Sequence, residues 1–234
     1  MDNTNNNEDE DNNKKTKTII STELIIHILI LFILFIICIW DRIVNIPVFP
    51  KNFLFLTQID LYSNIIYYSL YLYFKNIKKK KIPKKLQLLF NFNFCVSFCV
   101  FIMYWSMFLF DKETLYKKET KKMVPTVLNI LLHGGVFICN LSLILLIERK
   151  KKIEYIKNWF FLLFSIGYIG ILYLLNLLCD IRVYPFIYGS QYKFLLICIS
   201  SFIVCLIGHY IYIFITKKKR EKNKENNYQD LEMN

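Results

Sequence analysis

Hydrophobic residues along the chain gather into six blocks of about 20 residues each, and charged segments separate the blocks. A helix of about 20 apolar residues is long enough to cross the hydrocarbon core of a bilayer. The pattern therefore predicts six transmembrane helices, at residues 19–40, 53–74, 86–110, 125–147, 159–179 and 193–215. We expect an all-α fold, a polytopic membrane helical bundle.

The two ends of the chain are polar and lie outside these blocks. Residues 1–18 are rich in Asn, then acidic, then basic, a composition that favours a disordered segment. Residues 19–215 form the predicted transmembrane domain, and residues 216–234 form a basic and polar tail. A single membrane domain with two polar ends is the expected organisation.

The net charge of +12 is distributed in a way that indicates a membrane topology rather than a nucleic-acid partner. The lysine-rich runs adjoin the apolar blocks directly, and they are expected to lie among lipid headgroups. The two ends together with the second and fourth connections hold 21 of the 30 Lys and Arg residues. This bias predicts that both termini are cytoplasmic, although the third connection, with five lysines, goes against it. We expect a multi-pass protein of the endomembrane system, with the endoplasmic reticulum first among its compartments, or of the plasma membrane.

The seven cysteines all fall within predicted spans, where they are expected to pack as small apolar residues. Neither a disulfide set nor a metal site is expected from their spacing, and no cofactor is expected. The chain also lacks a phosphate-binding glycine loop, a Gly-x-Ser-x-Gly turn and a His-Glu-x-x-His motif. These absences exclude several common enzyme classes from consideration.

Polar residues inside the apolar blocks are the candidates for function, and His133 is the first of them. An ionisable ring in a lipid-like span is costly, so it marks a candidate functional site. Asn129 precedes it by one helical turn on the same face. Thr57 and Asp60 lie near the start of the second span, which begins on the same side of the membrane as the span of His133. At about 1.5 Å per residue, Thr57 and His133 lie at similar depths, so we expect Thr57, Asp60 and His133 to line one pocket.

Nucleophilic acyl transfer requires at least a nucleophile and a general base, and a hydroxyl beside an imidazole supplies both. The imidazole of His133 would take the proton of Thr57, and Asp60 would orient the imidazole. Structural roles are the alternative: a threonine at a helix entrance often serves as a cap, and a membrane histidine often bonds to another helix. The residues alone leave both interpretations open.

Three segments in order resemble one known family: residues 55–61 (FLTQIDL), residues 104–113 (YWSMFLFDKE), and residues 124–133, which end in His133. Residues 183–185 (VYP) add a fourth, shorter match. The chain is similar here to the androgen-induced family, which includes the androgen-dependent TFPI-regulating protein.

The resemblance implies six membrane spans. It also implies hydrolysis of fatty acid esters of hydroxy fatty acids, with a threonine nucleophile and a histidine. Those roles would fall on Thr57 and His133, with Asp60 and Asn129 in support. The chain departs from the family pattern at Ile130, where a histidine is usual, and at Gly134, where a threonine is usual.

The sequence therefore predicts an intramembrane lipid-ester hydrolase whose substrates, fatty acid esters of hydroxy fatty acids or similar acyl esters, arrive laterally from the bilayer. Two other functions remain as alternatives. One is a membrane scaffold or regulatory protein without catalysis, and the other is a proton-coupled transporter that uses Asp60 and His133 as a relay. The sequence assigns no protein partner.

Overall fold

The computed structural model describes residues 5–45, 55–78, 82–110, 126–146, 155–180 and 191–232, and these residues contain helices and no strands. The helices are α1 (Asn5–Asn45), α2 (Leu56–Leu72), α3 (Lys84–Phe110), α5 (Thr126–Ile130), α6 (Val136–Leu146), α7 (Asn158–Cys179) and α8 (Gln191–Glu232). Two π-helical turns, η3 (Tyr73–Ile77) and η5 (Leu131–Gly135), continue α2 and join α5 to α6. The all-α prediction is confirmed for the described part of the chain.

Five helical segments are long and apolar enough to cross a membrane: Thr22–Val44, Lys84–Phe110, Val127–Leu146, Asn158–Cys179 and Leu195–Lys222. They make the chain a multi-pass membrane protein. The remaining predicted span, the second (53–74), corresponds to α2, which has only 17 residues before η3 and a polar buried face. At about 1.5 Å per residue, α2 is about 26 Å long, slightly shorter than a typical hydrocarbon core.

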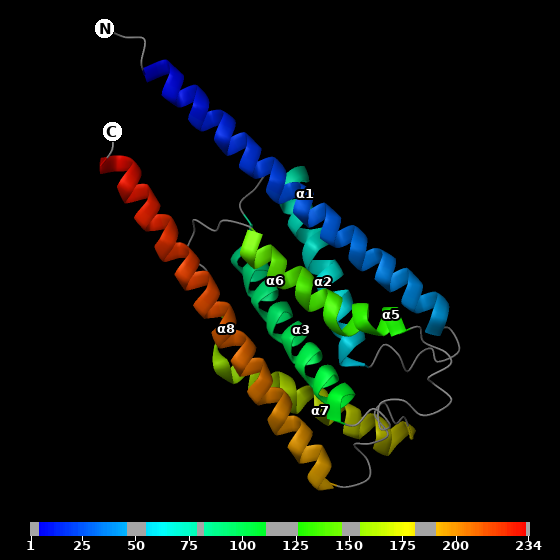
Figure 1. Ribbon diagram of the computed structural model, residues 1–234. Coiled ribbons are helices and arrows are strands. Elements are labelled where there is room, and N and C mark those ends of the chain that lie inside the picture. Colours follow the sequence, from blue (N-terminus) through cyan, green and yellow to red (C-terminus); the bar gives the residue numbers. More distant parts are fainter. Residues whose placement is uncertain are drawn as a thin grey trace.

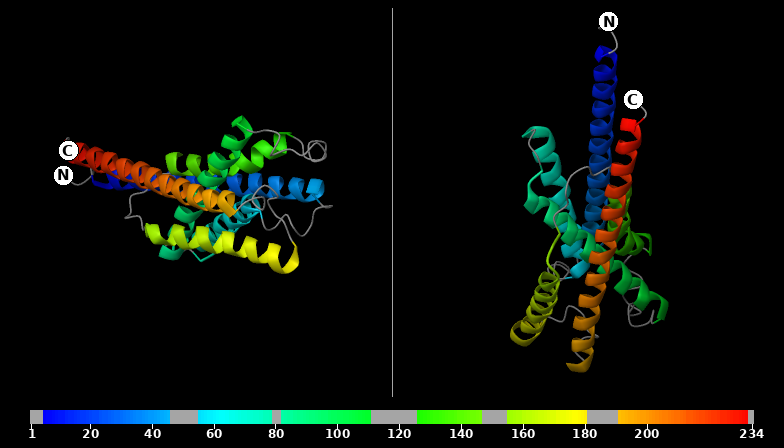
Figure 2. Two further views of the ribbon diagram at one scale, coloured as in Figure 1. Left: turned by 90° about the horizontal axis from the view of Figure 1, so that it is seen from below. Right: turned by 90° about the vertical axis from the view of Figure 1, so that its left-hand side faces the viewer.

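The long helices extend beyond their apolar segments at both ends of the chain. The backbone of α1 is already helical at Asn5, and α8 continues to Glu232. Residues 5–18 continue the helix of the first apolar segment, and adding residues to an existing helix costs far less than starting one. The disorder expected of residues 1–18 stays a prediction. Figures 1 and 2 show both extensions leaving the same end of the bundle. The cytoplasmic location of that end stays a prediction.

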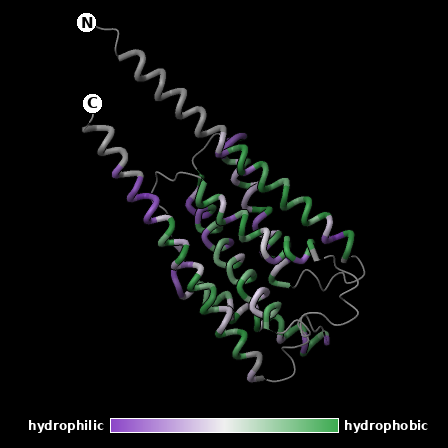
Figure 3. Tube along the Cα trace, viewed as in Figure 1, coloured by the Kyte–Doolittle hydropathy of each residue, from purple (hydrophilic) through white to green (hydrophobic). Residues whose placement is uncertain are grey.

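Helix α3 packs against α2, α6 and α8, and α1 packs against α2 (Figure 1). Helix α7 lies against α8 and crosses the lower half of the bundle. Apolar side chains remain exposed along the outer faces of α1, α7 and α8. Figure 3 shows that the hydrophobic part of α8 is followed by a hydrophilic part toward the C-terminus. Exposed apolar surface of this kind suits contact with lipid.

Helix α1 illustrates how the sequence selects the buried face. His27, Ile30, Leu34, Ile37 and Asp41 are buried, at spacings of three and four residues. Side chains at this spacing form one stripe along a helix. The apolar residues between them point outward, so α1 presents one face to α2 and the opposite face to lipid.

Candidate active site

Thr57 lies in the first turn of α2, close to the point where the chain enters the helix. The carbonyl of Phe55 accepts the first backbone hydrogen bonds of the helix, from Gln58 and Ile59. The Thr57 side chain is nearly buried, and its Oγ1 lies 3.2 Å from Nδ1 of His133. Two residues that are 76 positions apart in the sequence are therefore within hydrogen-bond distance.

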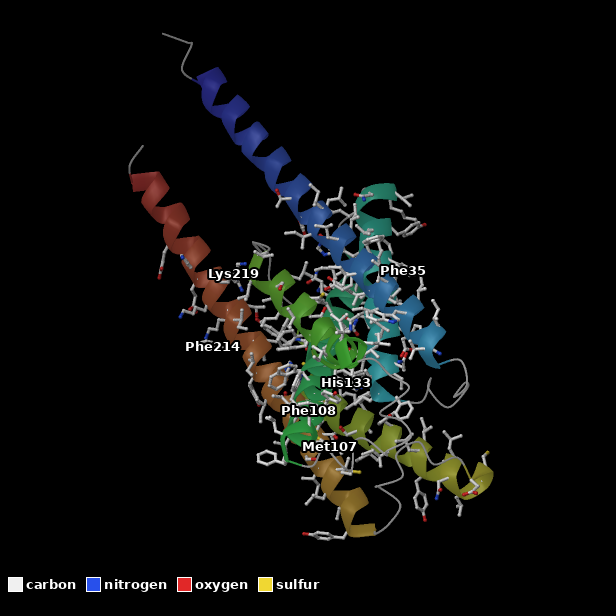
Figure 4. The ribbon with its side chains drawn as sticks, turned by 45° about the vertical axis from the view of Figure 1, so that its right-hand side comes forward. Phe35, Met107, Phe108, His133, Phe214 and Lys219 are labelled. Atoms are coloured by element: carbon white, nitrogen blue, oxygen red, sulfur yellow. The ribbon has the colours of Figure 1, made fainter. Side chains whose placement is uncertain are left out.

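His133 lies in the π-helical turn η5 rather than in a regular α-helix. A π-turn widens the helix by one residue and changes the direction of the side chains near it, and such turns are frequent at functional sites. Gly134 and Gly135 follow the histidine, and glycine weakens the preference for regular α-helix. The prediction of one uninterrupted helix over residues 125–147 missed this turn. Figure 4 shows His133 within the bundle, between α2 and α3.

The aromatic ring of Tyr104 covers one face of the imidazole. The two ring centroids are 3.8 Å apart and the planes differ by 3°. Tyr104 is 7% exposed and belongs to α3, and its ring also stacks with that of Phe108, at 6.0 Å. Tyr104 had no predicted role, because a single sequence does not show which face of α3 meets η5.

The next residue, Trp105, brings an unusual polar atom to the same region. Its indole Nε1 is buried and has no hydrogen-bond acceptor among the residues that the structure describes. The same atom lies 3.7 Å from the position that a Cβ of Gly134 would occupy. The indole N–H is therefore adjacent to the turn that carries His133.

Asp60 forms its hydrogen bonds with residues other than His133, whereas the sequence predicted that it would orient the imidazole. The Oδ1 atom of Asp60 accepts hydrogen bonds from Ser97 at 2.7 Å and from Asn64 at 2.8 Å. In the described part of the chain, no hydrogen bond joins the carboxyl to the imidazole. Relative to Thr57, Asp60 lies about 4.5 Å further along α2 and about 60° around its axis. From there its carboxyl bonds to Ser97 of α3, while Thr57 contacts His133 of η5.

Asp60 is instead one end of a buried polar network that links three helices. Asn140 of α6 donates to Oδ1 of Asn64 and to Oγ of Ser97, both at 2.9 Å. Tyr68 donates to Oδ1 of Asn140 at 2.8 Å. All five side chains are buried. Because an apolar interior supplies no water to polar groups, the network holds α2, α3 and α6 in one arrangement.

A second polar cluster fixes the first turn of α2 to α1. Gln58 donates to Oδ2 of Asp41 at 3.0 Å, and Arg42 donates to Oε1 of Gln58 at 2.8 Å. Arg42 also forms an ion pair with Asp41 at 3.0 Å. Gln58 adjoins Thr57, so the cluster positions the backbone of the candidate nucleophile.

The remaining candidates have partners of their own. Asn129 is partly buried in α5, one turn before His133, and its supporting role stays a prediction. His27 is stacked on Tyr71, and Nδ1 of His209 lies 3.2 Å from Oδ1 of Asn91. Over the described residues, no three His, Cys, Asp or Glu side chains come together as a metal site requires.

Comparison with known proteins gives one match. A model of the family described as FAR-17a/AIG1-like protein matches residues 22–220, which contain all the site residues described above. No curated protein and no solved structure shows significant similarity to the chain.

Proposed function

The chain belongs to the FAR-17a/AIG1-like family, the androgen-induced gene 1 family, and on that premise we propose that it is an intramembrane hydrolase of lipid esters. The family match confirms the resemblance found in the sequence. The single observation that carries the proposal is the 3.2 Å contact between Oγ1 of Thr57 and Nδ1 of His133. A nucleophile and its base within hydrogen-bond reach are the core of acyl-transfer chemistry.

In the proposed reaction, Nδ1 of neutral His133 accepts the hydroxyl proton while Oγ1 of Thr57 forms a bond to the carbonyl carbon of the ester. The carbonyl π electrons move onto its oxygen, and a tetrahedral intermediate and an imidazolium result. When the intermediate collapses, the carbonyl reforms, the bond to the alcohol oxygen breaks, and that oxygen takes the proton from the imidazolium. The products of this half-reaction are the free alcohol and an acyl-threonine.

Water completes the cycle. His133 accepts a proton from water, whose oxygen attacks the acyl-threonine carbonyl, and the second intermediate expels Oγ1, which regains its proton. The fatty acid is released and Thr57 is restored. This sequence needs no metal and no cofactor, because every proton and electron pair is accounted for by the ester, water and the two side chains.

The substrate class that we propose is fatty acid esters of hydroxy fatty acids or similar long-chain acyl esters. Two observations support an apolar substrate that arrives from the bilayer. The dyad lies among helices long enough to span a membrane. The ring of Tyr104 covers its imidazole, and the rings of Trp105 and Phe108 pack against Tyr104. Acyl chains pack well against such rings, and the bilayer concentrates these esters at the protein.

The transporter alternative finds less support. It requires a relay between Asp60 and His133, whereas the hydrogen bonds of Asp60 lead to Ser97 and Asn64. A scaffold without catalysis remains the main competitor. It predicts that loss of either dyad residue changes stability and nothing chemical.

The test uses the full chain, purified and reconstituted in lipid nanodiscs, with a long-chain acyl ester as substrate and a fluorophosphonate as covalent probe. Thr57→Ala and His133→Ala should each lower kcat by at least about 100-fold, and Thr57→Ala should abolish labelling. Thr216→Ala and His209→Asn are matched controls, because their side chains bond elsewhere, to Tyr212 and Asn91. Wild-type protein that neither hydrolyses esters nor reacts with the probe would rule out the hydrolase.

A further inference from the structure

The buried indole N–H of Trp105 is a polar group that the dyad chemistry leaves unused. The indole of tryptophan has one hydrogen-bond donor and no acceptor. Only an acceptor on another group can therefore form a hydrogen bond with it. Leaving a buried donor without an acceptor costs about 1–3 kcal/mol. The described residues supply no acceptor to Nε1 of Trp105, although the atom is buried. A donor retained at that cost calls for a ligand with an acceptor.

The surroundings of the indole define which ligand atom lies near it. The Trp105 ring meets the Tyr104 ring edge to face at 5.6 Å, and Tyr104 lies flat on the imidazole of His133. Phe108 closes another side at 5.3 Å. The described neighbours of the indole are aromatic rings and supply no acceptor to its N–H, so a bound molecule with an acceptor would fit beside it.

Gly134 keeps the approach to this donor free of a side chain. Of the atoms around the position that a Cβ would occupy, Nε1 of Trp105 is the nearest, at 3.7 Å. The other neighbours lie at 3.9 Å, which is ordinary van der Waals contact, so packing alone does not require glycine here. Glycine in a helix also costs about 1 kcal/mol relative to alanine. A side chain at position 134 would contact the indole nitrogen, and glycine leaves that contact unmade.

We propose that the indole N–H of Trp105 donates a hydrogen bond to the carbonyl oxygen of the scissile ester, with Gly134 providing the room for that oxygen. The inference rests on the proposed hydrolase function and adds a catalytic residue to it. As Oγ1 of Thr57 bonds to the carbonyl carbon, the π electron pair moves to the oxygen, and the N–H stabilises the developing charge. The indole keeps its proton throughout. Removal of one such donor lowers kcat by about 100- to 1,000-fold in other acyl-transfer enzymes.

The kinetic test compares ester hydrolysis by Trp105→Phe with that by Trp159→Phe. Trp159 is 56% exposed on α7, so its variant is the matched control and should keep the wild-type kcat. We expect Trp105→Phe to lower kcat by about 100-fold with a small change in KM. Gly134→Ser supplies a hydroxyl acceptor to the indole and should lower kcat as well. The double variant should be no slower than Trp105→Phe alone, because both changes remove the same hydrogen bond.

A spectroscopic readout distinguishes a donor from a residue that only packs. The chain has three tryptophans, so nitrogen-15 labelling of the indoles gives three N–H signals. A long-chain trifluoromethyl ketone, which forms a tetrahedral adduct with a serine- or threonine-type nucleophile, should move the Trp105 proton signal downfield and leave that of Trp159 in place. The shift should be absent in Thr57→Ala, in which no adduct forms.

The outcomes separate the two proposals. Wild-type hydrolysis with an unchanged kcat in Trp105→Phe, or an adduct on wild-type protein without a Trp105 shift, overturns the role of Trp105 and leaves the hydrolase standing. Absence of hydrolysis in the wild type overturns the hydrolase and this inference with it. If Trp105→Phe fails to fold, the wild-type spectrum and Gly134→Ser decide the question.

Discussion

The ring of Tyr104 lies parallel to the imidazole of His133, with the centroids 3.8 Å apart and 3° between the planes. The contact joins α3 to the π-helical turn η5, two elements that meet only in the folded chain. A stacked aromatic pair contributes about 0.5–1.5 kcal/mol beyond the area that it buries. The stack also restricts rotation of the imidazole and so keeps Nδ1 directed at Thr57.

Tyr104→Leu should therefore lower kcat by about 10- to 100-fold while the protein still folds, because small displacements of a catalytic group cost about 100-fold. Tyr104→Phe keeps the stack and should retain most of the activity. Ester hydrolysis in nanodiscs measures both. Tyr168→Leu is the control, since Tyr168 stacks on Phe164 within α7. Equal activity in Tyr104→Leu and wild type would mean that the stack does not position the imidazole.

We expect Asp60 to contribute to the stability of the helix bundle and not to the orientation of the His133 imidazole. Asp60→Asn retains Oδ1 as the acceptor for Ser97 and Asn64, so it should keep kcat within about 10-fold of wild type. Asp60→Ala removes both interhelical and local bonds, each worth about 0.6 to 1.7 kcal/mol in membrane proteins. It should lower the free energy of unfolding by about 1–3 kcal/mol, measured in bicelles. A fully folded but inactive Asp60→Asn would restore the orienting role that the sequence suggested.

Hydrophobic length predicted the helices well. The prediction of a span at 86–110 compares with Lys84–Phe110 for α3, and that at 159–179 compares with Asn158–Cys179 for α7. Lipid requires long apolar helices, and this requirement is visible in any single sequence. The sequence also predicted that Thr57 and His133 lie close together, from their similar depth in the membrane and from the family resemblance. Their catalytic roles stay proposals.

The direction of individual side chains was not predictable in the same way. Asp60 was expected beside His133 because it shares a segment with Thr57, yet it lies one turn further along α2, where its carboxyl bonds to Ser97. Tyr104 lies against His133 because one face of α3 meets η5, and a single sequence does not show which face that is. The π-turn itself, with one extra residue per turn, also redirects the side chains near it. Hydrophobic periodicity averages over such local changes, so it indicates a helix without fixing its faces.

Lys219 stabilises the end of α6 from a neighbouring helix. Its Nζ donates to the carbonyl oxygens of Ile144 at 3.0 Å and Leu145 at 2.6 Å, in the last turn of α6. Those carbonyls have no partner within their own helix, and a positive charge interacts favourably with that end. Figure 4 labels Lys219 on α8.

Lys219→Met should accordingly lower the free energy of unfolding by about 0.5–2 kcal/mol without changing the kcat of ester hydrolysis. Lys217→Met is the matched control, because Lys217 is exposed on the same helix. Unfolding in bicelles at low and high salt provides the measurement. A loss of stability that is identical in the two variants would assign the effect to net charge and not to capping.

Gly208 sets the distance between α8 and α3. A Cβ at position 208 would lie 2.9 Å from Cδ1 of Phe98, closer than real Cβ atoms approach, and 3.2 Å from its Cβ, which is tighter than most real contacts. Phe98 itself packs against Phe137 of α6, with ring centroids 5.4 Å apart, so its ring has little freedom to move aside. Small residues at such crossings let membrane helices approach closely, and here the close approach sustains the main contact of α8 with the bundle.

Gly208→Ala should therefore destabilise the protein by about 1–3 kcal/mol, the usual cost of overpacking. Gly167→Ala is the matched control, because nothing lies within 4 Å of its added Cβ. The control should be neutral or more stable by about 0.5–1 kcal/mol, since alanine favours helix over glycine. The free energies of unfolding in bicelles should thus change in opposite directions. If Gly208→Ala also gained stability, α8 would have room to move away from α3, and the contact would not be the tight crossing described here.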